Sequence, residues 1–211
     1  MERGERADLT DGAGHLAECV VTAASAGVLQ LTVLARRRQA RPDPALTVIQ
    51  AIAKGDRAEQ AVEIMTEVGV DVMVPWQAER CVAQWRGDRA DRGVARWRAA
   101  AVQAAKQSRR AWFPEITEPA GTAAAAERVR AADLALLLDP EAPASLAGTV
   151  IPAHGSIVLI VGPEGGISPA ESDVLGAAGA TGVRLGPTVL RASSAGAVAA
   201  GLVLARSPRW A

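Results

Sequence analysis

The chain has 211 residues, and its 23 acidic side chains balance its 23 lysines and arginines. This length fits one large or two small domains, and a composition of 49% hydrophobic and 22% charged residues excludes wholesale disorder, a collagen-like chain and a disulfide scaffold. A formal net charge of zero excludes a protein that coats nucleic acid through bulk charge alone.

Residues 6–34 predict a small β domain. Short apolar runs are separated by turn sequences at 11–14 and 25–27, and residues 28–34 alternate as in a half-buried strand. Residues 36–44 are charged, contain two prolines and lack apolar periodicity, which is typical of a linker. We therefore expect a first domain over residues 1–44 and a second over residues 45–211.

The second domain alternates strand and helix patterns. Two all-apolar runs, 134–138 and 157–161, are typical of parallel strands covered on both faces. Ser168, Pro169 and Glu171 form a capping-box pattern that predicts a helix start. Further strands are predicted at 46–52, at 70–74 with Pro75 closing the strand, and at 183–185, and helices at 58–67, 94–107, 123–132 and from 193 or 194 to 204. The fold class is α/β.

Residues 162–166, Gly-Pro-Glu-Gly-Gly, follow an apolar strand and precede the capped helix. Open α/β sheets bind ligands at this carboxyl edge. The glycines allow a ligand close to the backbone, and Pro163 stiffens the loop. The alternative is a tight turn without a ligand. The loop is neither a phosphate-binding Walker loop nor a dinucleotide fingerprint, because the required lysine and glycine spacings are absent.

A second loop, residues 185–196, also follows a predicted strand and precedes a helix with serines at its start. Arg191 is the only fixed charge in this loop. Taken alone, it is a candidate surface or capping arginine. The composition of loop 185–196 resembles that of loop 162–166, so both loops are candidates for one ligand site.

Residues 80–112 are strongly basic and predict an anion-binding face. Only Asp88 and Asp91 oppose a run of basic side chains, which are Arg80, Arg86, Arg89, Arg92, Arg96, Arg98, Lys106, Arg109 and Arg110. The two cysteines and two histidines lack the spacing of a zinc site, so we expect no metal. The apolar stretch 195–205 is too short to span a bilayer, so we expect a cytoplasmic protein away from membranes.

Several ordered motifs resemble the bacterial 16S ribosomal RNA (uracil-N3) methyltransferases of the SPOUT superfamily. The resemblance covers residues 46–211 and, more weakly, 3–34, where the chain is similar to the later part of that family's PUA-like β domain. The matching segments are 162–166, 185–187, 189–191, 54–57, 67–70, 79–81, 96–97 and 107–110.

This resemblance implies a trefoil-knotted α/β domain, preceded by a partial PUA-like β domain, that binds S-adenosylmethionine and acts as a homodimer with its active site at the subunit interface. It implies 16S ribosomal RNA or the small ribosomal subunit as substrate. By position, the cofactor-binding residues are Leu138, Gly162, Pro163, Glu164, Gly165, Gly166, Leu185, Gly186, Val189, Leu190 and Ser194.

Methyl transfer from a sulfonium is an in-line displacement that needs no metal, so the protein aligns the reactants and stabilises the acceptor's charge. A uracil ring nitrogen must lose its proton before it attacks. Arg191 is the candidate catalytic residue that stabilises the resulting negative charge. Glu164 is a candidate general base, with acceptance of backbone hydrogen bonds in its own loop as the alternative.

The RNA-binding residues implied by the motif positions are Arg80, Gln107, Arg109 and Arg110. Trp85, Trp97 and Trp112 are candidates to stack on bases, since RNA recognition favours splayed bases on aromatic planes. Burial at helical spacing is the commoner role of tryptophan, and we expect Trp97 to pack in the core.

Two departures from the family keep other interpretations open. Residues 192–195 read Ala-Ser-Ser-Ala where many relatives have Thr-Glu-Thr-Ala, and the chain begins at a point that resembles the middle of the β domain. The alternatives are a SPOUT enzyme that modifies another RNA position or transfer RNA, and a truncated, non-catalytic binder of cofactor or RNA. A generic nucleotide-binding α/β enzyme is disfavoured, because no phosphate-binding lysine or ribose-binding acid is suitably placed.

Overall fold

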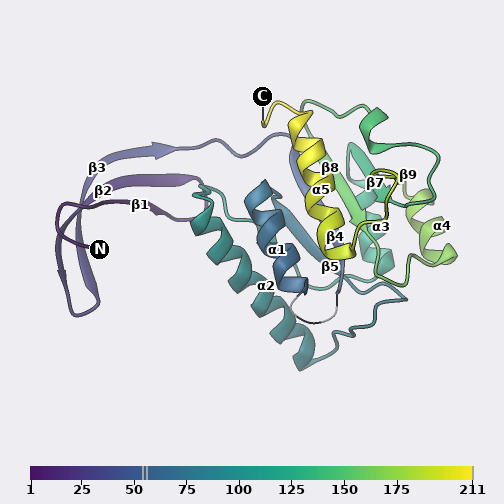
Figure 1. Cartoon of the computed structure of the whole chain (residues 1–211), viewed down its shortest axis with the longest axis horizontal. Helices are drawn as coiled ribbons and strands as arrows, with labels where there is room; N and C mark the ends of the chain where they lie inside the picture. Colours follow the sequence, from purple (N-terminus) through teal and green to yellow (C-terminus); the bar gives the residue numbers. More distant parts are fainter. Residues whose placement is uncertain (54, 56, 211) are drawn as a thin grey trace. The chain divides into compact units, whose positions relative to one another are not determined.

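The computed structural model describes residues 1–53, 55 and 57–210. Lys54 and Asp56, part of the 54–57 match, lie outside the described residues. The chain divides into two compact units (Figure 1). One comprises residues 1–41 and 109–113, and the other comprises residues 42–108 and 114–211.

The first unit is an antiparallel sheet in the order β1-β2-β3. Its strands are β1 (Arg6–Thr10), β2 (His15–Ser25) and β3 (Val28–Arg38). This region forms a separate antiparallel sheet, but the linker prediction for residues 36–38 was wrong, because β3 continues through them and Arg38 pairs with His15. The arginines are tolerated there because an edge strand leaves charged side chains in solvent.

Residues 109–113 extend the first unit although they lie far along the chain. Gly14 N donates to Ala111 O at 2.9 Å, and Phe113 N donates to Gly12 O at 2.9 Å. The Trp112 ring covers Gly14 so closely that an added Cβ would lie 2.7 Å from it. Gly14 has a φ of 94°, so both its conformation and its contact require glycine.

The second unit is built on a six-stranded parallel sheet in the order β6-β5-β4-β8-β7-β9. The α/β prediction is therefore confirmed. The strands are β4 (Ala45–Ala51), β5 (Val72–Trp76), β6 (Glu115–Ile116), β7 (Leu134–Leu138), β8 (Ser156–Val161) and β9 (Thr181–Val183).

Helices cover both faces of this sheet (Figure 1). Helices α1 (Arg57–Val68), α2 (Asp88–Gln107) and α5 (Ala192–Ala205) pack on the face that carries Val48. Helices α3 (Thr122–Arg130) and α4 (Pro169–Ala177) pack on the face that carries Ile49. A short 3₁₀ turn, η1, spans Leu146–Gly148. Successive residues of β4 thus enter opposite cores, as the pleat requires.

Several predicted boundaries differ from the structure. Pro75 lies inside β5 rather than after it, because β6 pairs only with Val72 and Met73, and beyond β6 the Pro75 carbonyl accepts from Ala120 N at 2.8 Å without any need for the N–H that proline lacks. Helix α2 begins at Asp88, six residues before the predicted start, since its first turns are exposed and lack apolar periodicity. Strand β9 ends at Val183, and Arg191, not a serine, occupies the N-cap position of α5.

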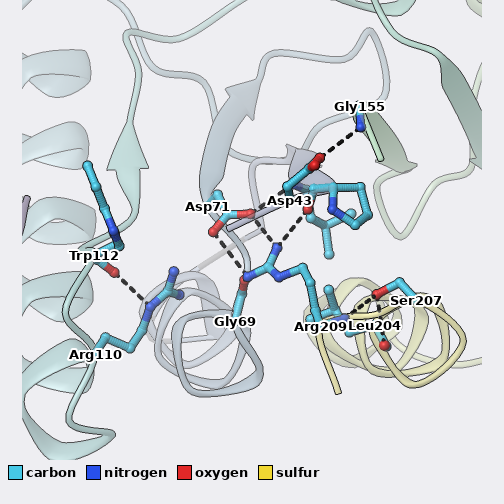
Figure 2. Close-up of polar contacts among 11 residues, drawn as sticks. Asp43, Gly69, Asp71, Arg110, Trp112, Gly155, Leu204, Ser207 and Arg209 are labelled. Atoms are coloured by element: carbon cyan, nitrogen blue, oxygen red, sulfur yellow. Dashed lines mark hydrogen bonds and ion pairs between the residues drawn. The ribbon is translucent and has the colours of Figure 1, made fainter. Parts of the chain in front are cut away.

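A buried arginine fastens the end of the chain to the amino edge of the sheet (Figure 2). Arg209 Nη1 donates to Asp71 Oδ2 at 2.5 Å and to Pro44 O at 3.2 Å. Its Nη2 donates to Gly69 O at 2.7 Å and to Asp71 Oδ1 at 3.2 Å. Asp71 also accepts from Leu46 N at 2.9 Å. The segment after α5 is therefore tied to the strands β4 and β5.

Candidate functional site

A cavity of about 550 Å³ lies at the carboxyl ends of β7, β8 and β9, which is a typical size for a small-molecule site. Three segments line it, each following one of these strands. The lining residues are Leu137, Leu138, Asp139, Pro140, Glu141, Val161, Gly162, Pro163, Glu164, Gly166, Ile167, Ser172, Leu185, Gly186, Thr188, Val189, Leu190, Arg191, Ala192 and Ala195. Parallel strands end at one edge of the sheet, so their loops converge on one ligand.

The loop 162–166 is held in a defined turn between β8 and α4. Gly166, with a φ of 75°, donates its N–H to Pro163 O at 2.9 Å. An added Cβ at Gly162 would lie 2.6 Å from Ile167 Cγ1, so the close packing there requires glycine. The predicted capping box is confirmed, with Ser168 as N-cap of α4. Both ends of the loop are thus fixed locally.

The cavity brings together most of the cofactor-binding residues that the sequence predicted. Gly165 and Ser194 are the two that do not line it. Gly165 instead lies against Arg80, and Ser194 is half-buried in the first turn of α5, where its N–H donates to Arg191 O at 2.9 Å. The predicted residues in the lining are Leu138, Gly162, Pro163, Glu164, Gly166, Leu185, Gly186, Val189 and Leu190.

The two predicted catalytic side chains both line the cavity. Arg191 is exposed, and its guanidinium has no hydrogen-bond or ion-pair partner among the described residues. Glu164 is also exposed, and within the described part of the chain its carboxylate accepts no hydrogen bond. Both charged groups are therefore available to a ligand.

Sequence reasoning missed two acidic residues of the lining. Asp139 and Glu141 follow β7, and Asp139 Oδ1 accepts from Glu141 N at 2.9 Å. The usable signal was their position directly after an apolar strand that ends at the same edge as β8. Together with Glu164 they place carboxylates around a cavity whose other walls are largely apolar, an arrangement that suits a ligand with a positive group.

The predicted RNA-binding residues fall in both units. Arg80 follows β5, and its Nη1 donates to Gly165 O at 3.2 Å. Gln107 is the exposed last residue of α2. Arg109 is exposed with a φ of 54°, and Arg110 Nε donates to Trp112 O at 2.8 Å, both within the first unit (Figure 2).

The tryptophans have structural roles. Trp97 is fully buried, which confirms its predicted packing, and it meets Trp85 edge to face with ring centroids 5.5 Å apart. Trp112 Nε1 donates to Gln39 O and Ala40 O at 3.1 and 3.0 Å. Arg41 stacks over the same ring at 5.5 Å from its centroid. Base stacking by Trp97 is excluded, because its ring has no exposed surface.

Part of the basic stretch is occupied by contacts within the second unit. Arg96 pairs with Glu59 at 3.1 Å, and Arg98 pairs with Glu118 at 2.8 Å.

Burial raises the pKa of the Cys81 thiol, whose Sγ donates to Trp76 O. Among the described residues there is no cluster of three or more potential metal ligands. None of the described helices combines the length and the apolar character needed to cross a membrane.

A parallel α/β sheet with a glycine-bearing cavity at its carboxyl edge defines a ligand-binding α/β domain of the kind many enzymes use. The family model for the RNA methyltransferase domain matches residues 41–204. Ribosomal RNA small subunit methyltransferase E of Mycobacterium tuberculosis is 46% identical over 211 residues, covering 98% of this chain and 80% of that relative. The chain therefore belongs to this family of RNA methyltransferases.

Solved structures give the same fold. A ribosomal RNA small subunit methyltransferase E from Neisseria gonorrhoeae, bound to S-adenosyl methionine, is 27% identical with a TM-score of 0.87 and covers 97% of this chain and 84% of its own. A methyltransferase from Legionella pneumophila, in complex with the same cofactor, is 26% identical with a TM-score of 0.86 and covers 98% and 85%. The similarity extends over both units of the chain.

Proposed function

We propose that this protein methylates N3 of a uridine in 16S ribosomal RNA with S-adenosylmethionine as methyl donor. The proposal is carried by the observation that the two predicted loops, 162–166 and 185–196, line the same cavity. In this cavity the Arg191 side chain has no protein partner within the described chain. The family membership and the donor named for the solved relatives support it. Small-subunit ribosomal RNA is the substrate named for the 46% identical relative.

The cavity fits the donor in volume and chemistry. Its apolar wall includes Leu138, Leu185 and Leu190 and suits an adenine ring, while Gly162 and Gly166 leave backbone groups accessible. The carboxylates of Asp139 and Glu141 suit the donor's positive groups. When bound, S-adenosylmethionine supplies a methyl group activated by the sulfonium charge.

The side chains at the cavity would act on the acceptor base. Glu164 accepts the N3 proton, and Arg191 stabilises the negative charge that the uracil oxygens then share. Both roles require unpaired charged groups beside the donor pocket, which is the state of these two residues within the described chain. The protein otherwise contributes alignment of donor and acceptor.

We further propose that the second unit is a trefoil-knotted SPOUT domain, that the first is part of a PUA-like domain, and that two chains form a homodimer with the site at their interface. An exposed apolar stripe on α5 supports the dimer: Val198 and Leu202 lie one turn apart, 43% and 39% exposed, and Val189 of the cavity is 77% exposed. Leu202→Glu is expected to yield monomers in sedimentation analysis. A dimer of unchanged stability would contradict this interface.

For RNA we propose contacts by Arg80, Gln107, Arg109 and Arg110, and a cytoplasmic site of action where ribosomal subunits are assembled. The exposure of Gln107 and Arg109 supports this. Neutralising Arg109 is expected to reduce the slope of log affinity against log salt by about 0.7 to 0.9, as for one lost phosphate contact. An unchanged slope would remove Arg109 from the RNA surface.

The decisive experiment combines calorimetry with S-adenosylmethionine and methylation of 16S ribosomal RNA and of small subunits by the same sample, with the methyl position mapped by mass spectrometry. We expect one donor site per chain and methyl at uridine N3. Methyl at another position would favour the other-position SPOUT enzyme, and binding without transfer would favour the non-catalytic binder. Absence of donor binding would overturn the cavity assignment.

Arg191→Ala sharpens this test. Loss of the charge that stabilises the acceptor is expected to lower kcat by about 100-fold or more, with the dissociation constant of the donor nearly unchanged. Arg128→Ala, which removes an exposed arginine of α3 outside the cavity, serves as the control and should retain activity. Full turnover by the Arg191 variant would exclude its catalytic role.

A further inference from the structure

The segment that follows β5 packs against the glycine loop of the cavity. Arg80 Nη1 donates to Gly165 O at 3.2 Å. A Cβ at Gly165 would lie 3.2 Å from Arg80 Cβ and 3.3 Å from Arg80 O, so backbone and side chain of Arg80 both touch this loop. Neither residue lines the cavity itself. Arg80 therefore contacts the part of the loop that does not line the cavity.

A buried carboxylate fixes this segment. Glu171 is only 6% exposed, and its Oε1 accepts from Glu79 N at 2.8 Å and from Thr122 Oγ1 at 3.0 Å. Its Oε2 accepts from Ser168 N at 3.2 Å. A capping box needs only the bond to Ser168. The other two bonds join α4 to the backbone beside Arg80 and to the first turn of α3.

The segment is also held from within, so it presents Arg80 in a defined place. Gln77 Oε1 accepts from Trp85 N at 2.8 Å, and Gln77 Nε2 donates to Ala83 O at 3.1 Å. Cys81 N donates to Ala78 O at 3.1 Å. The ends of residues 77–85 are thus drawn together. Arg80 stands in the middle of a closed loop.

We propose that Arg80 and Glu171 are positioning residues that hold the loop 162–166 in the conformation that receives the methyl donor. Glu171 fixes the backbone at Glu79, and Arg80 holds the Gly165 carbonyl. The proposal rests on the proposed function, in which this loop binds S-adenosylmethionine. It gives Arg80 an effect on donor affinity that needs no RNA.

The expected effect follows from pre-organisation. A loop that is ordered before binding loses less conformational entropy when the ligand arrives. Removing a hydrogen bond from a charged donor such as Arg80 is expected to weaken donor binding about tenfold, which corresponds to about 1.4 kcal/mol.

The test uses Arg80→Met, which keeps the aliphatic stem, Arg80→Lys, and Glu171→Gln, which retains an oxygen for Glu79 N–H. The matched control is Arg130→Met, because Arg130 is an exposed arginine on α3 paired only with Glu127 among the described residues. Donor affinity is measured by calorimetry without RNA. Hydrogen exchange of the amides of residues 164–167 is measured in the ligand-free protein.

We expect Arg80→Met to weaken donor binding about tenfold and to accelerate exchange at 164–167, and Arg80→Lys to restore part of both. Glu171→Gln should act in the same direction more weakly. Unchanged affinity and exchange in Arg80→Met would overturn the proposal, as would an effect on RNA affinity alone. Arg80 is exposed, so this variant should fold even if changes at Glu171 do not.

The two proposals fail in different ways. If the wild-type protein does not bind S-adenosylmethionine, the proposed function fails, and the exchange measurement in ligand-free protein still tests whether Arg80 orders the loop. If the wild type binds the donor and Arg80→Met binds it equally well, only the positioning role fails.

Discussion

The two edges of the parallel sheet differ in how their charged groups are used. At the amino edge, Asp133 accepts from Ser156 N and Oγ at 2.8 Å each, Asp43 accepts from Gly155 N at 2.8 Å, and Arg209 meets Asp71. At the carboxyl edge, the side chains of Glu141, Glu164 and Arg191 have no partner among the described residues. The charged side chains named at the amino edge therefore have partners within the protein, whereas those named at the carboxyl edge have none among the described residues.

This difference predicts that the charged groups of the amino edge contribute to the stability of the fold and those of the carboxyl edge to ligand binding. Charged groups that pair within the protein, as Asp71 does with Arg209, link elements of the fold that are far apart in sequence. Charged groups left without protein partners around a cavity gain their interactions only from a ligand. Open α/β sheets place ligands at the carboxyl ends of the strands, so changes at the two edges should affect different measurements.

The largest effect on binding is expected from Gly165→Val. An added Cβ at residue 165 would lie 3.2 Å from Arg80 Cβ and 3.3 Å from Arg80 O, so the loop or the Arg80 segment must shift by a few tenths of an ångström. Because the larger valine side chain adds to this crowding beside the donor loop, we expect donor affinity to fall by about 100-fold or more, about 2.7 kcal/mol. The midpoint of unfolding should change little, because Gly165 is exposed. Calorimetry with S-adenosylmethionine measures the loss.

The matched control is Gly176→Ala, since an added Cβ at Gly176 meets nothing within 4 Å. It should bind the donor as the wild type does. Wild-type affinity in Gly165→Val would contradict the assignment of the loop to the donor site. It would also contradict the proposed role of the carboxyl edge in binding.

The amino edge should show the opposite behaviour in Arg209→Met. Asp71 and Arg209 are only 16% and 11% exposed, and removing one partner of a buried ion pair costs about 3 kcal/mol of unfolding free energy. Donor affinity should stay at the wild-type value, because Arg209 lies at the other edge. Urea unfolding and calorimetry on the same variant test both statements.

Arg130→Met provides the control for this variant. Its ion pair with Glu127 is 51% and 74% exposed, so its removal should cost less than about 1 kcal/mol. An Arg209 variant as stable as this control, or one with weakened donor binding, would contradict the claim that the amino edge contributes to stability and the carboxyl edge to binding.

Local sequence signals predicted the elements whose information is local. Strand β7 was predicted with its observed limits because all five of its residues are apolar, and the capping box at Ser168 marks the start of α4 with side-chain chemistry alone. Pro75 and the strand residues 36–38 were misjudged. A proline is acceptable in a strand where no neighbouring strand needs its missing N–H, and arginines are acceptable where their side chains reach solvent, as those of residues 36–38 do. Both conditions depend on the sheet order and on which faces stay exposed, and neither leaves a local sequence pattern.

In the candidate site, too, some residues carry a local sequence motif and others are placed only by tertiary contacts. The glycine loop and the loop around Arg191 carry recognisable motifs, and both line the cavity. Asp139 and Glu141 carry no motif and enter the site only because β7 lies beside β8 in the sheet. Residues 109–113 likewise join the first unit through hydrogen bonds between Gly14 and Ala111 and between Gly12 and Phe113, which lie about 100 positions apart in the chain. Tertiary neighbours of this kind leave no local pattern.

The smallest effect is expected at Asp133, and it should depend on pH. Hydrogen bonds from the Ser156 side chain, and then from its backbone N–H, hold the pKa of Asp133 below its usual value of 3.8. A carboxyl group with a lowered pKa in the folded state stabilises the fold above the unfolded value and loses this contribution as the pH falls through the folded value. Asp133→Ala should therefore be less stable than the wild type at pH 6, and the difference should shrink below about pH 4.

Urea unfolding of both proteins at several pH values measures this difference, with Asp173→Ala as control because Asp173 is an exposed carboxylate of α4 that accepts no hydrogen bond from the described residues. The Asp173 control should stay close to the wild type throughout, and none of these variants should alter donor affinity at neutral pH. A stability difference for Asp133→Ala that stays constant down to pH 3 would mean that the charged form of Asp133 does not stabilise the contact between β7 and β8.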